Sequence, residues 1–532
     1  MSEATDQRTD QSAVTGRPPL VEAMLDPGFY PHRPAAVELR ETHISWVFRA
    51  GGLAYKLKKP IVLPFLDYGT AARRGEMCAE EVRLNRRLAP RIYRRVVSIV
   101  AAGGGYAMST RDDPEAVDYA VEMEAIDEER TLAALSDAGV LAATDVEEVA
   151  RLLAAFHAAA RVVAGPEAVP TALAPVAENL ATLGEIGAGL LDPRRLRAAA
   201  EFSDAFLTRH REQLERRGAA GLIRDGHGDL RAEHAIVPLS DIPYVYDCVE
   251  FDPRLREIDV ACDLAFLVMD LERLGRPECA RDLVATYRAA GGDPGDPELV
   301  AFFAAYRAWV RATVACERAA ELADDPAGRA ASEAEARSLL DLGHRFAWRA
   351  RGRSLLVVCG LAASGKTTLA ERLAAVSGLP LLSSDLLRKR RVGLAPEERG
   401  GPALYTEAAR LEVYRELGGE AGAALRHGDG AIVDATFHRE VERFAFEEGM
   451  GDALGVPAVI ECKAPPALLM RRADSRLEAG DSPSDAGAAV VLRQLGERDP
   501  LDGRWVRHHL VLRTDLPLDL QVSEVECFLD RG

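Results

Sequence analysis

A glycine-rich loop in the last third of the chain has the residue types and the spacing that hold phosphate groups. Residues 360–367 read GLAASGKT and match the pattern G-x-x-x-x-G-K-[ST]. An apolar stretch, 355–359, precedes the loop and a helical stretch follows it, as the pattern requires. In such a loop, backbone N–H groups and a helix N-terminus attract phosphate, the lysine reaches the outer phosphates, and the hydroxyl binds Mg2+. The sequence therefore predicts an ATP and Mg2+ site built from Gly360, Ala363, Ser364, Gly365, Lys366, Thr367 and Thr368.

Two aspartates follow later apolar stretches, where the carboxyl edge of a parallel sheet would bring them to one site. Asp434 ends the stretch GAIVD, and we expect its carboxylate to face Mg2+ or the water shell of the ion. Asp385 lies just beyond LLSS, and its neighbours Arg388 and Lys389 could hold an anionic substrate or the transferred phosphoryl group. The alternative for Asp385 is a helix N-cap that precedes a solvated basic face.

A basic segment followed by a stretch rich in Gly, Ser, Pro and Asp, residues 471–487, is typical of a mobile lid that closes over phosphates. Arg471, Arg472 and Arg476 could supply cations that neutralise the charge developing during phosphoryl transfer. An exposed basic helix before an ordinary loop is the alternative interpretation. Arg472, Arg476 and Lys366 enter the predicted catalytic set.

These features together resemble the P-loop small-molecule kinases, such as gluconate kinase, chloramphenicol phosphotransferase and the zeta-toxin group. The resemblance covers about residues 353–530. It implies an α/β P-loop NTPase domain with a parallel sheet, ATP as phosphoryl donor and a small-molecule hydroxyl as acceptor. It also implies that Asp385 is the base or the anchor for that hydroxyl and that the arginine segment is the lid.

The first two-thirds of the chain carries a second set of chemically capable residues. The motif HGD at 227–229 is followed by His234 and then by VEF at 249–251. This order resembles the catalytic loop and metal strand of the aminoglycoside phosphotransferase-like kinases. The resemblance implies that Asp229 orients or deprotonates an acceptor hydroxyl and that Asp247 or Glu250 holds Mg2+ on the ATP phosphates.

Two positions depart from the pattern of those kinases. His234 stands where the family has asparagine, and Glu250 stands where aspartate is usual. Imidazole nitrogen is a poor partner for Mg2+, which prefers oxygen. By position, the predicted metal-binding residues of the whole chain are Thr367, Asp434, His234, Asp247 and Glu250.

Three more segments fit the same kinase resemblance. LAYK at 53–56 matches a phosphate-pairing strand and makes Lys56 the candidate lysine. A helical stretch supplies its carboxylate partner, for which Glu81 is predicted and Glu80 is the alternative register. Met123 lies where the resemblance places the adenine-contacting hinge.

The elements that must position these residues follow from the pattern of apolar positions. Residues 38–126 predict strands and one helix at about 70–88, and residues after 131 become helical, with a clear amphipathic stretch at 146–161. We therefore predict an α+β protein-kinase-like domain with a strand-rich small lobe and a helical large lobe, followed by the α/β domain. The predicted boundaries are a disordered leader at 1–18, the kinase-like domain at 19–350 and the P-loop domain at 351–532.

Composition narrows the possible classes of protein. The 532 residues are 48% hydrophobic and 28% charged, which is typical of a globular protein with two or three domains. The net charge of -18 disfavours a broad surface for nucleic acid or anionic lipid. The eight cysteines lack metal-finger spacing, and we expect neither a secretory signal nor a membrane-spanning segment. A cytoplasmic location is therefore expected.

The sequence as a whole predicts an ATP-dependent phosphotransferase that acts on a hydroxyl of a small molecule. The P-loop domain is the surer ATP site, and the N-terminal domain is a second kinase or a degenerate one. One alternative is a regulatory switch that binds and slowly hydrolyses ATP, with a ligand-binding half that resembles a pseudokinase. Another alternative is a polynucleotide kinase, which the acidic charge and only 6% aromatic residues disfavour.

Overall fold

A computed structural model of the chain describes residues 17–531 apart from short gaps. The gaps are 64–65, 110–112, 323, 353–354, 396–397, 399–400, 402–403, 405, 428–429, 454–455 and 480–487. Most of the predicted leader therefore lies outside the described residues. The chain forms two compact units: the first comprises residues 1–163, 224–258 and 276–292, and the second comprises 164–223, 259–275 and 293–532.

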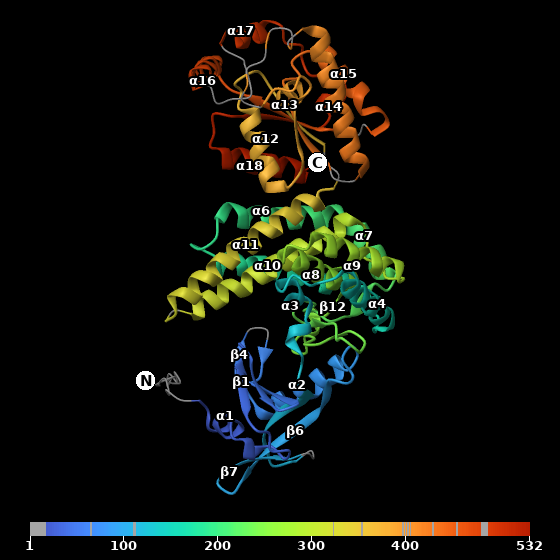
Figure 1. Ribbon diagram of the computed structural model, residues 1–532, viewed down its shortest axis with the longest axis vertical. Helices are drawn as coiled ribbons and strands as arrows, with labels where there is room; N and C mark the ends of the chain where they lie inside the picture. Colours follow the sequence, from blue (N-terminus) through green and yellow to red (C-terminus); the bar gives the residue numbers. More distant parts are fainter. Residues whose placement is uncertain are drawn as a thin grey trace, which may run out of the picture. The chain divides into compact units, whose positions relative to one another are not determined.

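The first unit is built on an antiparallel sheet of six strands in the order β1-β2-β3-β8-β6-β7 (Figure 1). Alternation of buried and exposed side chains explains the strands, as in β2, where Trp46, Phe48 and Ala50 enter the core. Gly51, with φ of 68°, makes the turn from β2 to β3. The strands are β1 (Val37–Glu41), β2 (Ser45–Ala50), β3 (Leu53–Lys58), β6 (Tyr93–Ala102), β7 (Gly105–Ser109) and β8 (Ala116–Glu124).

Helix α2 (Ala71–Asn85) packs against β6 and β8 of this sheet. It begins where predicted, because the Thr70 hydroxyl accepts a hydrogen bond from the Arg73 N–H at 3.2 Å. The motif at 227–229 lies in a loop without regular structure. The other elements of this unit are α1 (Pro19–Met24), β4 (Val62–Leu63), β5 (Leu66–Asp67), α3 (Leu132–Asp137), α4 (Ala143–Ala159), β10 (Ala235–Ile236), β11 (Tyr244–Val245) and α9 (Pro277–Ala289).

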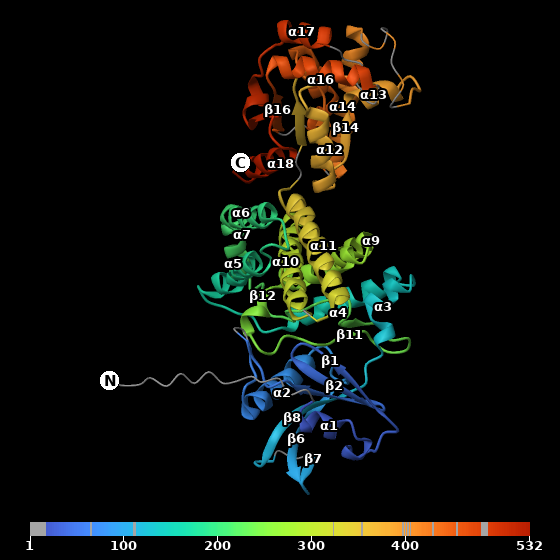
Figure 2. The same ribbon diagram turned by 90° about the vertical axis from the view of Figure 1, so that its left-hand side faces the viewer.

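The second unit begins with a group of helices, in which α10 and α11 lie side by side (Figures 1 and 2). Helix α10 is long and apolar enough to cross a membrane by length and composition alone. Its apolar 18-residue window is 83% buried inside the structure, because alanine and aromatic side chains there fill the core. The helices are α5 (Ala168–Ile186), α6 (Pro193–Arg209), α7 (Arg211–Ala219), α8 (Val260–Arg273), α10 (Pro297–Glu321) and α11 (Pro326–Ala350). Short strands β9 (Ile223–Asp225) and β12 (Glu257–Asp259) pair with each other, and all but the first residue of β9 and the last of β12 belong to the first unit.

A parallel five-stranded sheet in the order β14-β15-β13-β16-β17 follows in the same unit. Apolar side chains of α14 and α15 pack on one face, and those of α12 and α18 pack on the other (Figure 1). The strands are β13 (Leu355–Cys359), β14 (Leu381–Ser383), β15 (Ala431–Asp434), β16 (Ala458–Lys463) and β17 (His509–Arg513). The helices are α12 (Lys366–Ser377), α13 (Ser384–Arg390), α14 (Glu407–His427), α15 (Glu440–Met450), α16 (Pro466–Ala479), α17 (Ala488–Gly496) and α18 (Leu518–Arg531).

The predicted fold class is confirmed in both parts, a strand-rich lobe with helices and a parallel α/β sheet. The predicted domain boundary near residue 350 falls between α11 and β13. It stays a prediction, because the helices from α5 to α8, α10 and α11 group with the parallel sheet in one compact unit.

Candidate functional site

The glycine loop joins β13 to α12, as the sequence predicts. All five residues of β13 are buried, which fixes the strand in the middle of the sheet. Gly360 has φ of 141°, and a Cβ there would lie 2.5 Å from the carbonyl oxygen of Cys462. Gly365 has φ of 88° and caps the N-terminus of α12. Only glycine meets both demands without strain, so the loop backbone keeps the shape that a phosphate site needs.

Lys366, Thr367 and Asp434 come together at the carboxyl edge of the sheet. Asp434 ends β15, in register with Val358 of β13. The Thr367 hydroxyl donates a hydrogen bond to Asp434 Oδ2 at 2.8 Å. Burial raises the pKa of the Asp434 carboxyl, and this effect exceeds the lowering by Lys366 and Thr367. Asp434 Oδ1 is buried and has no hydrogen-bond partner among the residues that the structure describes.

These residues fit a magnesium ion. Thr367 offers a hydroxyl oxygen, and Asp434 offers a carboxylate oxygen that nothing in the described residues satisfies. Oxygen donors of this kind suit Mg2+, which takes one or two protein oxygens together with phosphate oxygens of a substrate. Thr367 and Asp434 would therefore hold the ion.

Asp385 lies near this group and is tied to its own helix. It sits in the first turn of α13, and the Arg388 guanidinium pairs with its carboxylate. The residue before the helix is Ser383, so the alternative in which Asp385 is the N-cap does not hold. The Asp385 charge also contributes, after burial, to the raised pKa of Asp434.

Sequence reasoning missed three residues that surround the glycine loop. Ser383 donates a hydrogen bond to Asp434 Oδ2 at 3.4 Å, and Gln494 Oε1 accepts one from the Ala362 N–H at 2.8 Å. Thr514 is buried, and its hydroxyl donates to the carbonyl oxygen of Ser364. Thr514 follows the last apolar strand, which is the signal that identified Asp434.

Arg472 is the one lid arginine whose side chain contacts the loop region in the described part of the chain. Its Nη2 donates to the carbonyl oxygen of Thr514 at 2.8 Å, and its Nη1 donates to the Thr514 hydroxyl at 3.4 Å. Arg471 is exposed. The side chain of Arg476 and the predicted lid stretch from 480 to 487 lie outside what the structure describes.

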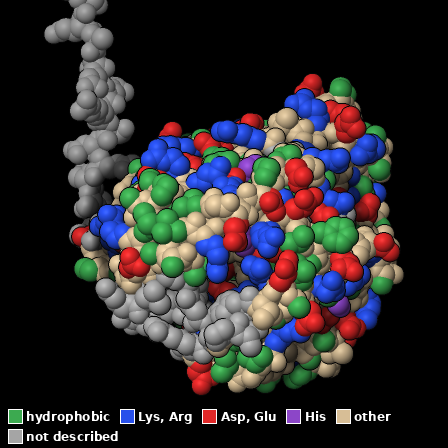
Figure 3. All heavy atoms as spheres, turned by 90° about the horizontal axis from the view of Figure 1, so that it is seen from above, with side chains coloured by type: hydrophobic (Ala, Val, Ile, Leu, Met, Phe, Trp, Pro, Cys, Tyr) green, Lys and Arg blue, Asp and Glu red, His purple; other side chains and the backbone are tan. Residues whose placement is uncertain are grey.

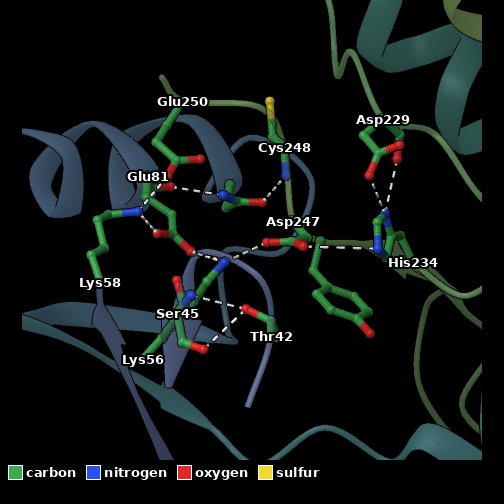
Figure 4. A network of polar contacts seen from close by, with 12 residues as sticks. Thr42, Ser45, Lys56, Lys58, Glu81, Asp229, His234, Asp247, Cys248 and Glu250 are labelled. Atoms are coloured by element: carbon green, nitrogen blue, oxygen red, sulfur yellow. Dashed lines mark hydrogen bonds and ion pairs between the residues drawn. The ribbon is translucent and has the colours of Figure 1, made fainter. Parts of the chain in front are cut away.

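The first compact unit, residues 1–163, 224–258 and 276–292, is the kinase-like unit of the chain. It places two lysines of β3 on one face of the sheet, because side chains alternate along a strand. Lys56 was predicted and Lys58 was not. The fully buried carboxylate of Glu81 lies 2.9 Å from Lys56 Nζ and 2.6 Å from Lys58 Nζ (Figure 4). Glu80 pairs with Arg83 and Arg256 instead. Glu81, and not the alternative register, therefore supplies the carboxylate.

Both predicted metal carboxylates of this unit contact lysines. Asp247 Oδ1 lies 2.6 Å from Lys56 Nζ. Glu250 accepts hydrogen bonds from Lys58 Nζ and from the Tyr68 hydroxyl. Burial lowers the pKa of Lys58, but Glu250 and Glu81 outweigh it and hold that pKa well above its ordinary value. Burial likewise raises the pKa of Asp247, yet Lys56 and His234 leave it below its ordinary value.

The predicted catalytic loop adds Asp229 and His234 to the same network (Figure 4). Gly228, with φ of 87°, makes the turn, and a Cβ there would lie 2.8 Å from the carbonyl oxygen of Leu255. Arg231 Nε donates to Asp229 Oδ2 at 3.0 Å. His234 Nε2 lies 3.8 Å from Asp247 Oδ2. The structure thus connects the predicted base to the predicted metal residues.

Met123 lies in an apolar environment. It is buried in β8 within a cluster of apolar side chains that includes Cys78 and Val82. Its predicted contact with adenine stays a prediction. No group of three or more His, Cys, Asp and Glu side chains arranged to hold a metal ion occurs among the described residues.

Comparison with known proteins agrees with the fold. Residues 355–501 match a family model described as an AAA domain. The uncharacterized protein Rv2004c of Mycobacterium tuberculosis is 30% identical over 466 residues, which are 86% of this chain and 90% of that protein. The uncharacterized protein Mb2027c of Mycobacterium bovis matches to the same extent. This chain belongs to the family of these mycobacterial proteins.

This chain is also similar in fold to separate solved kinases, which cover different shares of it. A gluconokinase from Sinorhizobium meliloti 1021 is 19% identical, covers 34% of this chain and 93% of its own, and has a TM-score of 0.26. A choline/ethanolamine kinase family protein from Mesorhizobium loti is 14% identical, covers 60% of this chain and 94% of its own, and has a TM-score of 0.36. The predicted fusion of a kinase-like fold with a P-loop domain is confirmed.

Proposed function

We propose that the P-loop domain transfers a phosphoryl group from ATP to a hydroxyl of a small molecule. The observation that carries the proposal is the unsatisfied Asp434 Oδ1, buried beside the Thr367 hydroxyl and Lys366 at the end of the glycine loop. A buried acceptor without a partner is rare in proteins, and a bound cation would satisfy it.

In the reaction, the acceptor oxygen would bond to the terminal phosphorus, the bond from that phosphorus to the β-γ bridging oxygen would break, and ADP would leave. Lys366 and the loop N–H groups would hold the phosphates and offset their charge. Magnesium, held by Thr367 and Asp434, would neutralise further charge on the phosphates. Asp385 would orient the acceptor hydroxyl and take its proton, and Arg472 would contact the transferring group.

ADP release in the presence of sugars, polyols, nucleosides and aminoglycosides tests this proposal. We expect one acceptor to stimulate release by the wild-type chain and Lys366→Ala to abolish that stimulation. Lys463→Ala is the matched control, because Lys463 is half-exposed and lies outside the glycine loop. Stimulation that survives Lys366→Ala but is lost in Asp229→Ala would place the transfer in the kinase-like unit and contradict the proposal.

A second candidate is an ATP-driven regulatory switch whose kinase-like half binds a ligand. The pairing of both predicted metal carboxylates with lysines favours it. This candidate requires ATP hydrolysis that no acceptor accelerates, so the same acceptor panel distinguishes the two functions.

Polynucleotide phosphorylation has weaker support. On the face of the molecule drawn in Figure 3, Lys and Arg side chains are interspersed with Asp and Glu. A strand-binding groove instead needs a continuous basic path with aromatic side chains. Filter binding of oligonucleotides at low salt tests this alternative, and we expect no retention.

A further inference from the structure

The side chain of Gln494 reaches the glycine loop from helix α17. Its Oε1 accepts a hydrogen bond of 2.8 Å from the Ala362 N–H. A backbone N–H can only donate, so this contact assigns the oxygen of the carboxamide to the side that faces Ala362. The Nε2 atom of Gln494 donates to none of the residues that the structure describes. The carboxamide therefore holds two unused N–H donors beside the loop.

Packing of α17 on the loop fixes the position of this carboxamide. Val491 is fully buried and belongs to an apolar cluster with residues 361–363 of the loop. Positions three apart lie on the same face of a helix, so Gln494 shares with Val491 the face that covers the loop. Helix α16 contacts α17 and adds Leu469 and Ala473 to the same cluster. Burial of its neighbours, and not one hydrogen bond alone, thus keeps Gln494 at the loop.

The backbone N–H groups at the two ends of the glycine loop have different partners. Those of Gly360 and Ser364 donate to carbonyl oxygens of the chain at 3.2 and 3.1 Å, and that of Ala362 donates to Gln494. The N–H groups in the first turn of α12 have no acceptor within the helix, so this end of the loop attracts phosphate. At the other end, the N–H of Ala362 is taken, and the two donors of Gln494 stand in its place.

The order of groups along the loop indicates which phosphate lies near Gln494. In a loop of this pattern, the backbone near the helix N-terminus holds the inner phosphates, and the lysine reaches outward. A nucleotide bound in this direction extends its terminal phosphate away from the start of α12, toward the end of the loop where Ala362 and Gln494 lie. An amide N–H pair is a suitable donor for phosphate oxygens there.

We propose that Gln494 is a ligand of the terminal phosphate of ATP, with Oε1 held by Ala362 and Nε2 donating to the phosphate. The inference rests on the P-loop function proposed above and makes α17 part of the ATP site. ADP lacks the terminal phosphate and cannot make this contact. Gln494 therefore distinguishes ATP from ADP.

Nucleotide binding by variants of Gln494 tests the inference on the full chain. Gln494→Glu keeps an acceptor for Ala362 and replaces the two donors by a charged oxygen, so it separates phosphate binding from support of the loop. Gln494→Met removes both roles at a similar side-chain length. Calorimetric titration with ADP and with a non-hydrolysable ATP analogue measures each Kd in the presence of Mn2+, which takes oxygen ligands as Mg2+ does. Binding that is lost in Lys366→Ala belongs to the P-loop.

Gln494→Glu should weaken binding of the ATP analogue about tenfold or more and binding of ADP by less than about threefold. The reason is that repulsion replaces a hydrogen bond to a charged group. Leu492→Glu is the matched control, because it adds the same charge to α17 at a side chain that is 56% exposed. It should leave both Kd values within about twofold, since salt screens an exposed charge.

Two results with Gln494→Glu would overturn the inference: an unchanged Kd for the ATP analogue, or equal weakening of both nucleotides. In either case Gln494 would only support Ala362. If the Glu variant does not fold, Gln494→Met decides, and the same selective loss of the ATP analogue is expected. Nucleotide binding that Lys366→Ala does not reduce would defeat the P-loop function together with this inference. Failure of the Gln494 contact alone leaves the Lys366-dependent binding intact, so the two failures are distinct.

Discussion

The two candidate sites of this chain both contain lysine and carboxylate side chains. The sites differ in the partners of their carboxylates. In the described part of the P-loop domain, Asp434 receives hydrogen bonds only from hydroxyl groups, and one of its oxygens has no partner there. In the kinase-like unit, Asp247 and Glu250 each contact a lysine ammonium. A carboxylate with an unsatisfied oxygen can bind a cation, whereas the charge of a carboxylate paired with an internal lysine is already balanced, and removing only one partner of such a pair is destabilising. Partners, rather than residue type, therefore distinguish the carboxylates of the two candidate sites.

Lys366→Ala should produce the largest effect on activity, because it removes a positive group from the proposed phosphate site of the P-loop domain. Loss of one preorganised positive group at developing charge lowers kcat by about a hundredfold to a thousandfold. The melting curve should stay close to that of the wild type, since Lys366 makes no ion pair with the residues that the structure describes. Steady-state ADP release measures the change. Activity within a few-fold of wild type, together with a normal melting curve, would contradict the assignment of the P-loop.

Lys58→Met tests how much the buried lysine–carboxylate network of the kinase-like unit contributes to stability. The change leaves Glu81 and Glu250 buried without a cation that both contact, and such a loss costs about 3–5 kcal/mol. Urea unfolding of the full chain measures the difference in unfolding free energy. Lys59→Met is the control, because its partner Glu41 is half-exposed and such pairs contribute at most about 1 kcal/mol. Equal losses of unfolding free energy in both variants would show that the buried network of Lys58 contributes no more to stability than the half-exposed pair of Lys59.

The sequence predicts the P-loop site well because its signal is local. The strand, the glycine spacing and the helix lie within a few residues of one another, so residues 355–368 specify their own geometry. Asp434 follows from the rule that parallel strands end at one edge. The partners of Lys58 could not be predicted in the same way, because Glu81 and Glu250 are 23 and 192 residues away along the chain. Only the folded unit reveals that Lys58 and not Lys56 reaches Glu250.

Thr514→Val should have an intermediate effect on the P-loop side. The hydroxyl joins the Ser364 carbonyl to Arg472, so its loss loosens both the glycine loop and the lid arginine. We expect KM for ATP to rise about tenfold, the equivalent of one or two hydrogen bonds. Ser523→Ala is the control, because that hydroxyl bonds only within α18 in the described structure. A change in kcat without a change in KM would mean that Thr514 acts on the chemical step and not on nucleotide binding.

Asp434→Asn should have the smallest effect on stability. It should increase the stability of the metal-free protein while it lowers the activity. The pKa of Asp434 is raised, so the native state keeps its proton longer than the unfolded chain as pH increases. Above the ordinary pKa of an aspartate, ionisation therefore favours the unfolded chain, and the metal-free protein loses stability as pH rises toward the folded pKa. Asparagine removes this penalty, so we expect a gain of roughly 0.5–1 kcal/mol at neutral pH, together with loss of Mn2+ binding. Unfolding at several pH values with EDTA measures the gain, and a variant less stable than wild type at neutral pH would show that the Asp434 carboxylate supports the fold after all.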